Sequence, residues 1–483
     1  MAFKIPRLEP RKVLALTSII GGLAMSANAW AVPSFTRQTG WSCATCHTSY
    51  PQLTPMGRIF KLMGYTTENL QPQQKVEAKV GNVVHLLLPR ISQFSIFVQA
   101  ADTHVAGGQA VLHGPSATRA GGSAVGDNNN LQVPKQVSLF YAGEITPHVG
   151  DFLHITYSGN SGSFGFDDSS IVRAQAWTLG RYNTLIAGVD VNNTPSATDL
   201  WNTSTDWQAP FFSSNYTAAG AVPTTFIAAS QGASFPVIGL GAYAADIVGP
   251  NRANWFYIEA DGYDNSEGTG AGPNSGVIGE GGGNQAGNFG QLAGTAPYLR
   301  LAYQHDWSDW NWEVGTYDMW SRVYAAPTSS AVDRFYDYDL DSQLQWLDIN
   351  DNSNVTVRAN LIHEDARFAA EDVGVGSSDG HGQLNTFNLN ATYWYHDEYG
   401  AQGGFQDVTG TANSNFWGGN IYTSANGSPN TTDEWVEASY LPWWNTRLSV
   451  RYTMFNTFRG LTGNNGVSPS KFNTIELLAW IAY

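Results

Sequence analysis

The sequence contains little charge, and the charge that it has is mainly acidic. Only 13% of its 483 residues are Asp, Glu, Lys or Arg, about half of the ~25% that is usual in soluble domains. Aspartate and glutamate number 40 against 24 lysines and arginines, which gives a net charge of -16. Because phosphate backbones are bound by clustered lysine and arginine, we expect no nucleic-acid partner.

Cysteine is scarcer still, and long apolar runs are missing from most of the chain. Two cysteines are too few for a disulfide-rich scaffold. Beyond the N-terminal segment, no stretch approaches the ~18 consecutive apolar residues that a membrane-spanning helix needs. The sequence therefore predicts neither a small disulfide-bonded domain nor a bundle of transmembrane helices.

The N-terminus has the three parts of a secretory signal peptide. Four basic residues precede a short apolar stretch, and small residues follow at Ala27–Ala29 and Ala29–Ala31. This order is typical of a cleaved signal. The alternative is a membrane anchor, but the apolar run is short for a span of ~20 residues. We predict that residues 1–31 are a signal peptide and that the protein is exported.

Aromatic residues and alternating strands make up most of what is present. The chain has 23 Phe, 17 Trp and 22 Tyr, enough apolar material to exclude a disordered chain. Apolar and polar residues alternate with a period of two, and the polar positions include arginine and asparagine. Examples are the segments 299–304, 355–361, 387–394 and 447–454. Segments of about ten residues with this pattern are typical of transmembrane β-strands, although an exported antiparallel sandwich would alternate too.

Two further patterns favour a membrane barrel. Aromatic residues gather near segment ends, as an interfacial girdle requires; they are Trp307, Trp310, Trp312, Trp394, Tyr395, Trp443 and Trp444. The last segment alternates up to a terminal aromatic, with one apolar face made of Ile475, Leu477, Ala479, Ile481 and Tyr483. We therefore predict an all-β transmembrane barrel of about 16 antiparallel strands, which also explains why the mean hydropathy is only -0.24.

Long tracts rich in Gly, Asn and Ser separate the predicted strands. They lie at about 105–130, 192–216, 261–297, 371–383, 407–433 and 460–472. These tracts are too long for hairpin turns and resemble extracellular loops, whereas short connections such as Thr146–His148 are expected to be periplasmic turns. The predicted organisation is a signal peptide (1–31), a short N-terminal segment (32–70), a linker (71–84) and a barrel (85–483).

Both cysteines occur in one pentad, Cys43-Ala44-Thr45-Cys46-His47. C-x-x-C-H is the attachment signature of haem c: two thiols bind the vinyl groups and the histidine becomes the proximal iron ligand. A redox dithiol would need a thioredoxin-like context, a zinc site would need further nearby ligands, and a plain disulfide leaves His47 unexplained. We predict one covalent haem c held by Cys43, Cys46 and His47.

The segment around the pentad is short, and its second axial ligand stays open. Thr54–Pro55 predicts a helix start, and Met56 and Met63 lie on one face of that helix. The candidates for the distal ligand are Met63, Met56, His85 or an open position, with methionine raising the haem potential. Residues 32–70 number only 39, too few for an independent core. We therefore expect them to plug the periplasmic mouth or the lumen of the barrel.

The residues on both sides of the pentad resemble a known family. The segments 31–40 and 53–65, together with the pentad, are similar to the fused monohaem cytochrome–porins, which include the outer-membrane iron-oxidising cytochromes c of iron bacteria. The resemblance implies a porin in the outer membrane of a Gram-negative bacterium, with haem c on its periplasmic side. It further implies an oxidoreductase acting on metal ions. Extracellular Fe(II) is then the electron donor, and a blue-copper protein or soluble cytochrome c in the periplasm is the acceptor.

Carboxylates provide candidate Fe(II) ligands, because oxygen ligands suit that cation. Four share one face of an extended segment and four more follow, at Asp333, Asp337, Asp339, Asp341, Glu364, Asp365, Glu371 and Asp372. His363 and Glu364 are candidates to join such a site. The alternative is a solvated lumen or loop surface. Two other functions also remain open: a diffusion porin whose lumen contains a haem plug, and an electron conduit for a donor other than iron.

Overall fold

The structure is a computed structural model of the whole chain. It describes residues 33–49, 51–67, 75–80, 83–89, 93–107, 129–159, 163–203, 225, 237–265, 292–324, 331–348, 350–369, 380–413, 427–464 and 467–483. The predicted signal peptide, residues 1–31, lies outside the described residues. Within the described residues, no helix is both long enough and apolar enough to cross a membrane.

The N-terminal part consists of short helices and two small hairpins. Its elements are α2 (Pro33–Thr39), α3 (Cys43–Cys46), β1 (His47–Ser49), β2 (Gln52–Leu53), α4 (Pro55–Leu62), β3 (Lys75–Val80) and β4 (Val83–Pro89). Strand β1 pairs with β2, and β3 pairs with β4. The expected linker, 71–84, therefore includes a strand, and the first barrel strand begins at Phe94 rather than at residue 85.

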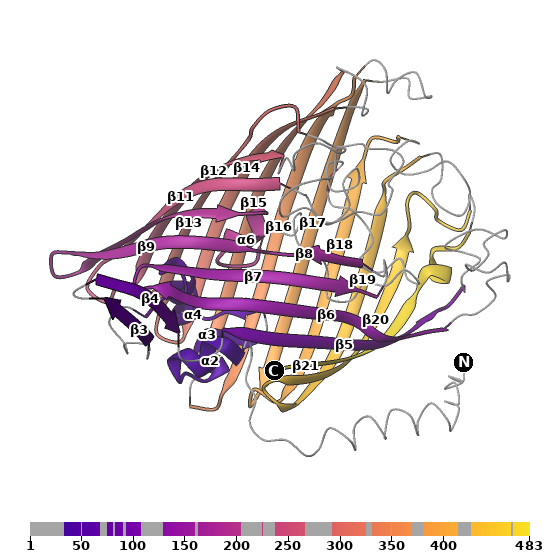
Figure 1. Cartoon of the computed structure of the whole chain (residues 1–483). Coiled ribbons are helices and arrows are strands. Elements are labelled where there is room, and N and C mark those ends of the chain that lie inside the picture. The colour runs from indigo at the N-terminus through magenta and orange to yellow at the C-terminus, as the bar shows by residue number, and fades with distance from the viewer. Residues whose placement is uncertain are drawn as a thin grey trace.

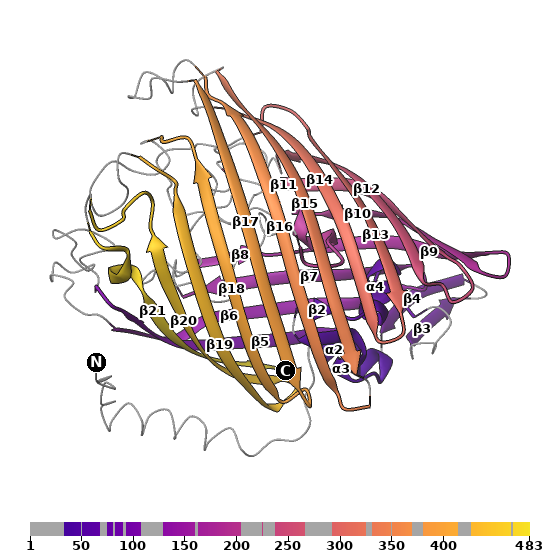
Figure 2. The same cartoon turned by 180° about the vertical axis from the view of Figure 1, so that it is seen from behind.

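The rest of the described chain is one closed antiparallel barrel (Figures 1 and 2). Its strands are β5 (Phe94–Val105), β6 (Asn129–Thr146), β7 (Val149–Ser158), β8 (Ser163–Phe166), β9 (Ser170–Leu179), β10 (Asn183–Asn192), β11 (Val237–Val248), β12 (Asn254–Asn265), β13 (Ala296–Trp307), β14 (Trp310–Tyr324), β15 (Val332–Asp348), β16 (Ser353–Arg367), β17 (His381–Tyr395), β18 (Tyr399–Gly410), β19 (Thr431–Trp443), β20 (Thr446–Thr457) and β21 (Thr474–Ala482).

The wall of this barrel has sixteen positions in the described part of the chain, although seventeen strands are numbered. Strands β8 and β9 both pair with β7, β8 along its second half and β9 along its first, so together they occupy one position. The last strand, β21, pairs with β5 and closes the ring. Closure leaves the barrel itself without a free edge, and the predicted fold class and strand number are confirmed.

Short and long connections lie at opposite ends of the barrel. At one end, turns of a few residues join β6 to β7 and β13 to β14. At the other end, the connections coincide with the predicted Gly- and Asn-rich tracts, for example between β12 and β13. A short helix, α6 (Pro195–Thr198), follows β10, and a 3-10 turn, η2 (Pro469–Phe472), precedes β21. Helices α2, α3 and α4 lie at the end with the short turns (Figures 1 and 2).

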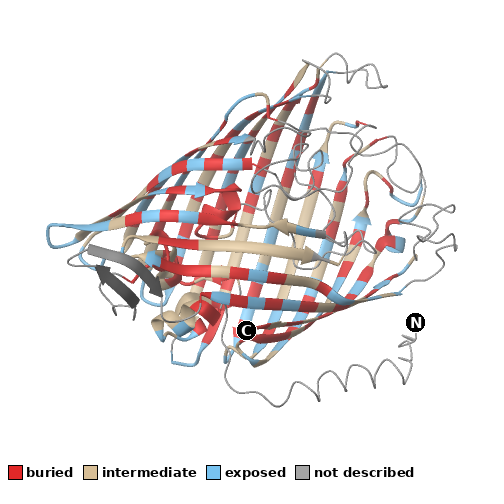
Figure 3. Ribbon diagram, in the orientation of Figure 1, coloured by how far each residue is buried: buried red, intermediate tan, exposed pale blue. Residues whose placement is uncertain are grey.

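Burial alternates along the strands in the predicted way (Figure 3). In β13, Tyr298, Arg300 and Gln304 face the lumen and are at most 2% exposed, whereas Leu299 and Leu301 are exposed on the outside. Most of the predicted girdle also faces outward, since the side chains of Trp307, Trp310, Trp312, Tyr395 and Trp443 are exposed. An apolar outer face with a polar inner face is the pattern that a barrel in lipid requires.

One girdle residue was assigned wrongly. Trp394 is 1% exposed and points inward, because it alternates with the outward Tyr393 and Tyr395. Its ring lies under the guanidinium of Arg447, 5.5 Å from the ring centroid, and fills the space beside Gly400, where a Cβ would come within 2.7 Å of it. Inward aromatic residues are therefore part of the core.

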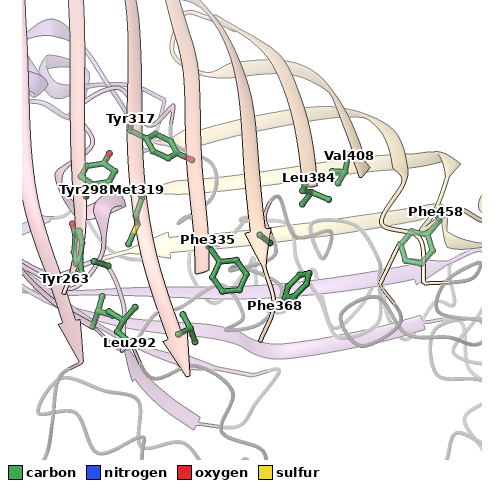
Figure 4. Packing of buried hydrophobic residues seen from close by; sticks show 14 of the residues in the cluster. Tyr263, Leu292, Tyr298, Tyr317, Met319, Phe335, Phe368, Leu384, Val408 and Phe458 are labelled. Carbon is green, nitrogen blue, oxygen red and sulfur yellow. The ribbon is translucent and has the colours of Figure 1, made fainter. Parts of the chain in front are cut away.

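The side chains that face the lumen are arranged in layers along the barrel. At the end with the long connections, an apolar cluster lines the inner face, and Figure 4 shows its Tyr298, Tyr317 and Phe335 among other labelled members. Arg300, two positions further along β13, belongs to a buried charged network. Gln304, two positions beyond Ala302, contacts the N-terminal helices. The barrel core is thus mostly lumenal.

Candidate functional site

The predicted haem-binding pentad forms one helical turn and the start of a strand. Cys43–Cys46 is helix α3, and the backbone N–H of His47 caps it by donating to the carbonyl of Cys43. His47 itself is extended and begins β1. Cys43 is 4% exposed, whereas Cys46 and His47 are half-buried. Both cysteines are thiols that are not joined in a disulfide.

Thr54 fastens this turn to the next helix. As predicted, it is the N-cap of α4 with Pro55 in the first turn, and its hydroxyl accepts from the N–H of Gly57 at 3.1 Å. The same hydroxyl donates to the carbonyl of Thr45 at 2.6 Å, and the N–H of Thr54 donates to the carbonyl of Cys46 at 2.9 Å. One residue therefore fixes α3 and α4 relative to each other.

Gly57 permits the closest approach between the two helices. A Cβ at this position would lie 2.2 Å from the carbonyl oxygen of Cys46, with the carbonyl carbon and Cα of Cys46 at 3.0 and 3.1 Å. These are all backbone atoms, so no side-chain rotation relieves the contact. The glycine is required by this packing, not by its own backbone angles.

The protonation states of the pentad follow from its burial. Burial, and secondarily Cys43, raise the pKa of the Cys46 thiol to about 12. Reactive redox dithiols have lowered thiol pKa values, so this environment is the opposite of theirs. Burial also lowers the pKa of His47 to about 4, an effect only partly offset by hydrogen bonds with the backbone of Pro51 and Gln52. The imidazole is neutral at pH 7, the form that binds metals.

Helix α4 is docked inside the lumen by a buried arginine. Arg58 is fully buried, and its guanidinium donates to the side chains of Gln304 (2.8 Å) on β13 and Asn311 (3.1 Å) on β14. It also donates to Gln345 on β15 and, at 3.0 Å, to the carbonyl of Leu53. Burial lowers the pKa of Arg58 to about 10, which leaves it charged at neutral pH. The predicted contact between this N-terminal segment and the lumen is therefore confirmed.

Aromatic and aliphatic side chains complete the core of the plug. The ring of Phe35 on α2 stacks on Tyr65 at 5.2 Å and packs edge-on against Phe60 at 5.1 Å. Tyr65 in turn stacks on Phe152 of β7 at 5.8 Å. On the other side of α4, Leu62 joins an apolar cluster of the barrel wall. The plug core is consequently shared with the barrel, as its small size predicts.

The distal-ligand candidates are placed differently from one another. Met56 is half-buried in the first turn of α4, two residues after Thr54. Met63 is the C-cap of α4 and packs, with Ile59, against the apolar cluster of the wall. His85 lies within β4, outside the side chains that the structure describes. The distal ligand stays a prediction.

Beyond the plug, the segment after β10 folds into the lumen and meets a buried arginine. The guanidinium of Arg300 donates to Asp341 at 2.9 and 3.2 Å and to Thr203 at 3.0 Å. It also lies 3.7 Å from carboxylate oxygens of Asp199 and Glu313. Trp201, 1% exposed, packs here as well and donates its indole N–H to Gln304 at 2.8 Å. This network links the segment to the wall.

The predicted carboxylate row is partly brought together. Asp333, Asp337, Asp339 and Asp341 all face the lumen from β15 and are buried. Glu364 lies directly opposite Asp337 across the β15–β16 ladder and is also buried. His363 and Asp365 point to the other face, where their side chains are 3.7 Å apart. His363 and Glu364 therefore cannot share a metal ion from one strand, and Glu371 and Asp372 lie outside the described residues.

Sequence reasoning missed a second carboxylate group. Asp190, Glu259 and Asp261 lie on β10 and β12, and each offers an oxygen within 4.8 Å of the others. Nothing in the local sequence signals this proximity, because it depends on the alignment of three strands. Arg58 was missed as a docking residue for the same reason, since its partners come from β13 to β15.

The structure defines a class of protein. A closed sixteen-stranded antiparallel barrel with an apolar outer face, a polar lumen, short turns at one end and long connections at the other is an outer-membrane barrel of porin type. No family model matches the sequence, and no curated protein matches it.

Solved structures with a similar fold are outer-membrane channels and porins. The outer-membrane channel DcaP of Acinetobacter baumannii is similar over 81% of this chain and 96% of its own, with 10% identity and a TM-score of 0.43. The OmpT loop L8 deletion mutant of Vibrio cholerae covers 81% and 98% of the two chains with 9% identity and a TM-score of 0.42. Salmonella typhi OmpF covers 81% and 97% with 12% identity and a TM-score of 0.41. These likenesses are of fold and do not assign a function.

Proposed function

We propose that the protein is an outer-membrane electron-transfer protein that carries one covalent haem c on its lumenal plug. In this proposal Cys43 and Cys46 bind the haem, and His47 is the proximal iron ligand. The observation that carries it is the complete C-x-x-C-H pentad on a segment docked inside the barrel. The proposal includes a distal iron ligand, which is Met56 or Met63.

The donor set fits the group. Two thiols one helical turn apart are followed at once by an imidazole that is neutral at pH 7. These are the groups that bind two vinyl carbons and an iron ion. When bound, haem supplies one-electron redox chemistry at a potential set by axial ligation, burial and hydrogen bonding.

The chain's own residues hold this donor set still. Thr54 and Gly57 fix the turn that carries the thiols against α4. Arg58 fixes α4 to three wall strands. A rigid site lowers the reorganisation that accompanies a change of charge, which is the physical requirement for fast electron transfer. In this view the residues of the plug and wall are positioning residues.

We further propose that the donor is extracellular Fe(II) and that the acceptor is a periplasmic blue-copper protein or soluble cytochrome c. Fe(III) is poorly soluble unless the medium is acidic, so oxidation at the cell surface keeps the product outside. Only an electron then crosses a hydrocarbon core ~30 Å thick. Because short turns are periplasmic in outer-membrane barrels, the proposal assigns the plug to the periplasmic side. The activity is that of an oxidoreductase acting on metal ions.

Solute diffusion is the second candidate, and the barrel supports it more directly than it supports electron transfer. Sixteen-stranded barrels with polar lumens enclose aqueous channels. The observation against free diffusion is that α4 and the segment 193–203 occupy the lumen, where Arg58 and Arg300 bind them to the wall. A liposome assay separates the two functions, because a plugged conduit does not pass small sugars.

The deciding experiment is anoxic reduction. The full-length protein is produced with the c-type haem attachment machinery, purified and mixed with Fe(II), and the reduced haem spectrum is recorded against other donors, including reduced sulfur species. We expect reduction by Fe(II). No reduction by any donor refutes electron transfer, and reduction only by other donors refutes the choice of iron.

A matched variant tests the attachment itself. Cys43→Ala with Cys46→Ala is expected to abolish haem that survives denaturing electrophoresis, while the barrel still folds. His47→Ala is expected to keep the covalent haem but change its absorption spectrum, because the proximal ligand is lost. Haem staining of the double variant at the wild-type level contradicts the proposal.

A further inference from the structure

We propose that Asp190, Glu259 and Asp261 form a binding site for a divalent metal ion in the lumen. Each carboxylate offers an oxygen within 4.8 Å of the other two. The three side chains are 2%, 0% and 6% exposed, so the cluster is buried on the inner face of β10 and β12. This site is separate from the haem-binding pentad and does not depend on the proposed electron transfer.

Neighbouring side chains donate a hydrogen bond to one oxygen of each carboxylate. Asn192 donates to Asp190 Oδ1 at 2.6 Å and to Asp261 Oδ1 at 3.2 Å, and the hydroxyl of Tyr257 donates to Glu259 Oε2 at 2.9 Å. In the described part of the chain, Asp190 Oδ2, Glu259 Oε1 and Asp261 Oδ2 are buried and have no donor at ideal hydrogen-bond geometry, while Glu259 interacts with the side chains of Thr198 and Asp261. Oriented ligands with vacant oxygens are what a metal site needs, and leaving such oxygens unfilled is costly.

Gly241 creates the space in which the carboxylates meet. It lies directly opposite both Asp190 and Asp261 in the registers of β11 with β10 and β12. A Cβ at Gly241 would lie 1.7 Å from Asp261 Oδ1 and 3.2 Å from Asp190 Oδ2. Any other residue would therefore push the Asp261 carboxylate away from Asp190. A glycine is required where the two acids approach each other.

Lys61 and Arg300 are the cations near the cluster, and their contacts lie with other groups. Within the described residues, no lysine or arginine forms an ion pair with any member of the cluster. The ammonium of Lys61 on α4 attracts Asp190 and Glu259 through its charge without an ion-pair contact, and it donates to the backbone carbonyl of Asp199 at 2.7 Å. Arg300 lies opposite Glu259 in the β12–β13 register, yet its guanidinium is bound to Asp341. Three close carboxylates repel one another unless a cation or shared protons neutralise them.

The ligand chemistry defines the class of cation. Carboxylate oxygens with no nitrogen or sulfur donor suit Mg²⁺, Ca²⁺, Mn²⁺ and Fe²⁺ rather than softer metals. Because these cations take six or more ligands, water or a further oxygen would complete the coordination. The site lies between the docked plug and the lumenal apolar cluster, whose Tyr263 is two residues after Asp261.

The test uses Mn²⁺ as the probe and the full-length, haem-loaded protein in detergent at pH 7. Free Mn²⁺ gives a six-line electron paramagnetic resonance signal that falls on binding. We expect one lumenal site with an affinity at or tighter than ~1 mM, the weak limit of carboxylate sites for divalent cations. Asp261→Asn and Glu259→Gln should each weaken that site at least tenfold, whereas Asp433→Asn, which removes another buried lumenal carboxylate, should not.

A second variant keeps all three acids and removes only their space. Gly241→Ala is expected to abolish the Mn²⁺ site, whereas Gly403→Ala, whose Cβ would meet nothing closer than 3.5 Å, should leave it intact. Retention of the barrel is checked by heat-modifiable gel mobility. The proposal is overturned if the wild-type protein binds no Mn²⁺ up to ~1 mM, which would mean that protons neutralise the cluster. It is also overturned if Gly241→Ala binds as tightly as wild type.

Discussion

Gly57→Ala should loosen the plug without harming the barrel, and the structure sets the size of the effect. The new Cβ would lie 2.2 Å from the carbonyl oxygen of Cys46, so α3 and α4 must separate by about 1 Å to restore a normal contact. Overpacking of this kind costs up to ~3 kcal/mol, while alanine gains at most ~1 kcal/mol over glycine in a helix. The net loss of about 2 kcal/mol corresponds to a roughly 30-fold larger opening equilibrium of the plug.

Alkylation of Cys43 measures that equilibrium. This thiol is 4% exposed, so a maleimide reaches it only when the segment opens, and the labelling rate follows the open population. Protein made without haem attachment keeps the thiol available. We expect roughly 30-fold faster labelling in Gly57→Ala and an unchanged rate in Gly403→Ala. Equal rates in both variants would refute the argument that the glycine is required by the contact with Cys46.

Two further predictions concern docking and pH. Arg58→Met should weaken the docking of the plug by about 3 kcal/mol, because buried acceptors on the wall lose their charged donor. Protease should therefore release the N-terminal segment faster from Arg58→Met than from Arg58→Lys, which keeps the charge. Identical release from the two variants contradicts the prediction. Burial, partly offset by His396, raises the pKa of Asp397 in the β17–β18 turn to about 6. The ionised carboxylate therefore destabilises the fold above that pH, and the penalty disappears as the pH falls towards 4. Asp397→Asn should stabilise the barrel by about 1 kcal/mol at pH 7 and by nothing near pH 4. The gain at pH 7 is small because solvent screens this half-exposed carboxylate. Equal denaturation midpoints for the wild type and the variant at pH 7 would show that the penalty is absent.

Features encoded over a few consecutive residues were predictable from the sequence. Alternation with a period of two assigns each strand residue to a face without knowledge of the partner strands, which is why the fold class was confirmed. Thr54 and Pro55 identify the start of α4 by local chemistry alone. The terminal strand likewise shows its outward face, with Ile475 exposed and Glu476 buried.

The features that failed depend on register between strands or on the face that a single residue takes. Trp394 is an aromatic residue near a strand end, as a girdle residue should be, yet the parity of β17 turns it inward. His363 and Glu364 are adjacent in sequence, and for that reason they lie on opposite faces of β16. Asp190 and Asp261 are far apart in sequence but meet because both lie opposite Gly241. A two-residue slip of β11 would keep every residue on its face but move Gly241 away from both acids, so alternation alone does not specify their proximity.

Helix α4 shows why so short a segment can be ordered. An isolated helix of eight residues is unstable in water, but this one has a partner on every side. Gly57 contacts the backbone of Cys46, Phe60 packs on Phe35, and Arg58 and Leu62 are bound into the barrel wall. The wall contacts come from β9 to β15, which are far apart along the chain. The plug can therefore complete its core only when those strands are already side by side, so its order is a property of the closed barrel rather than of the segment itself.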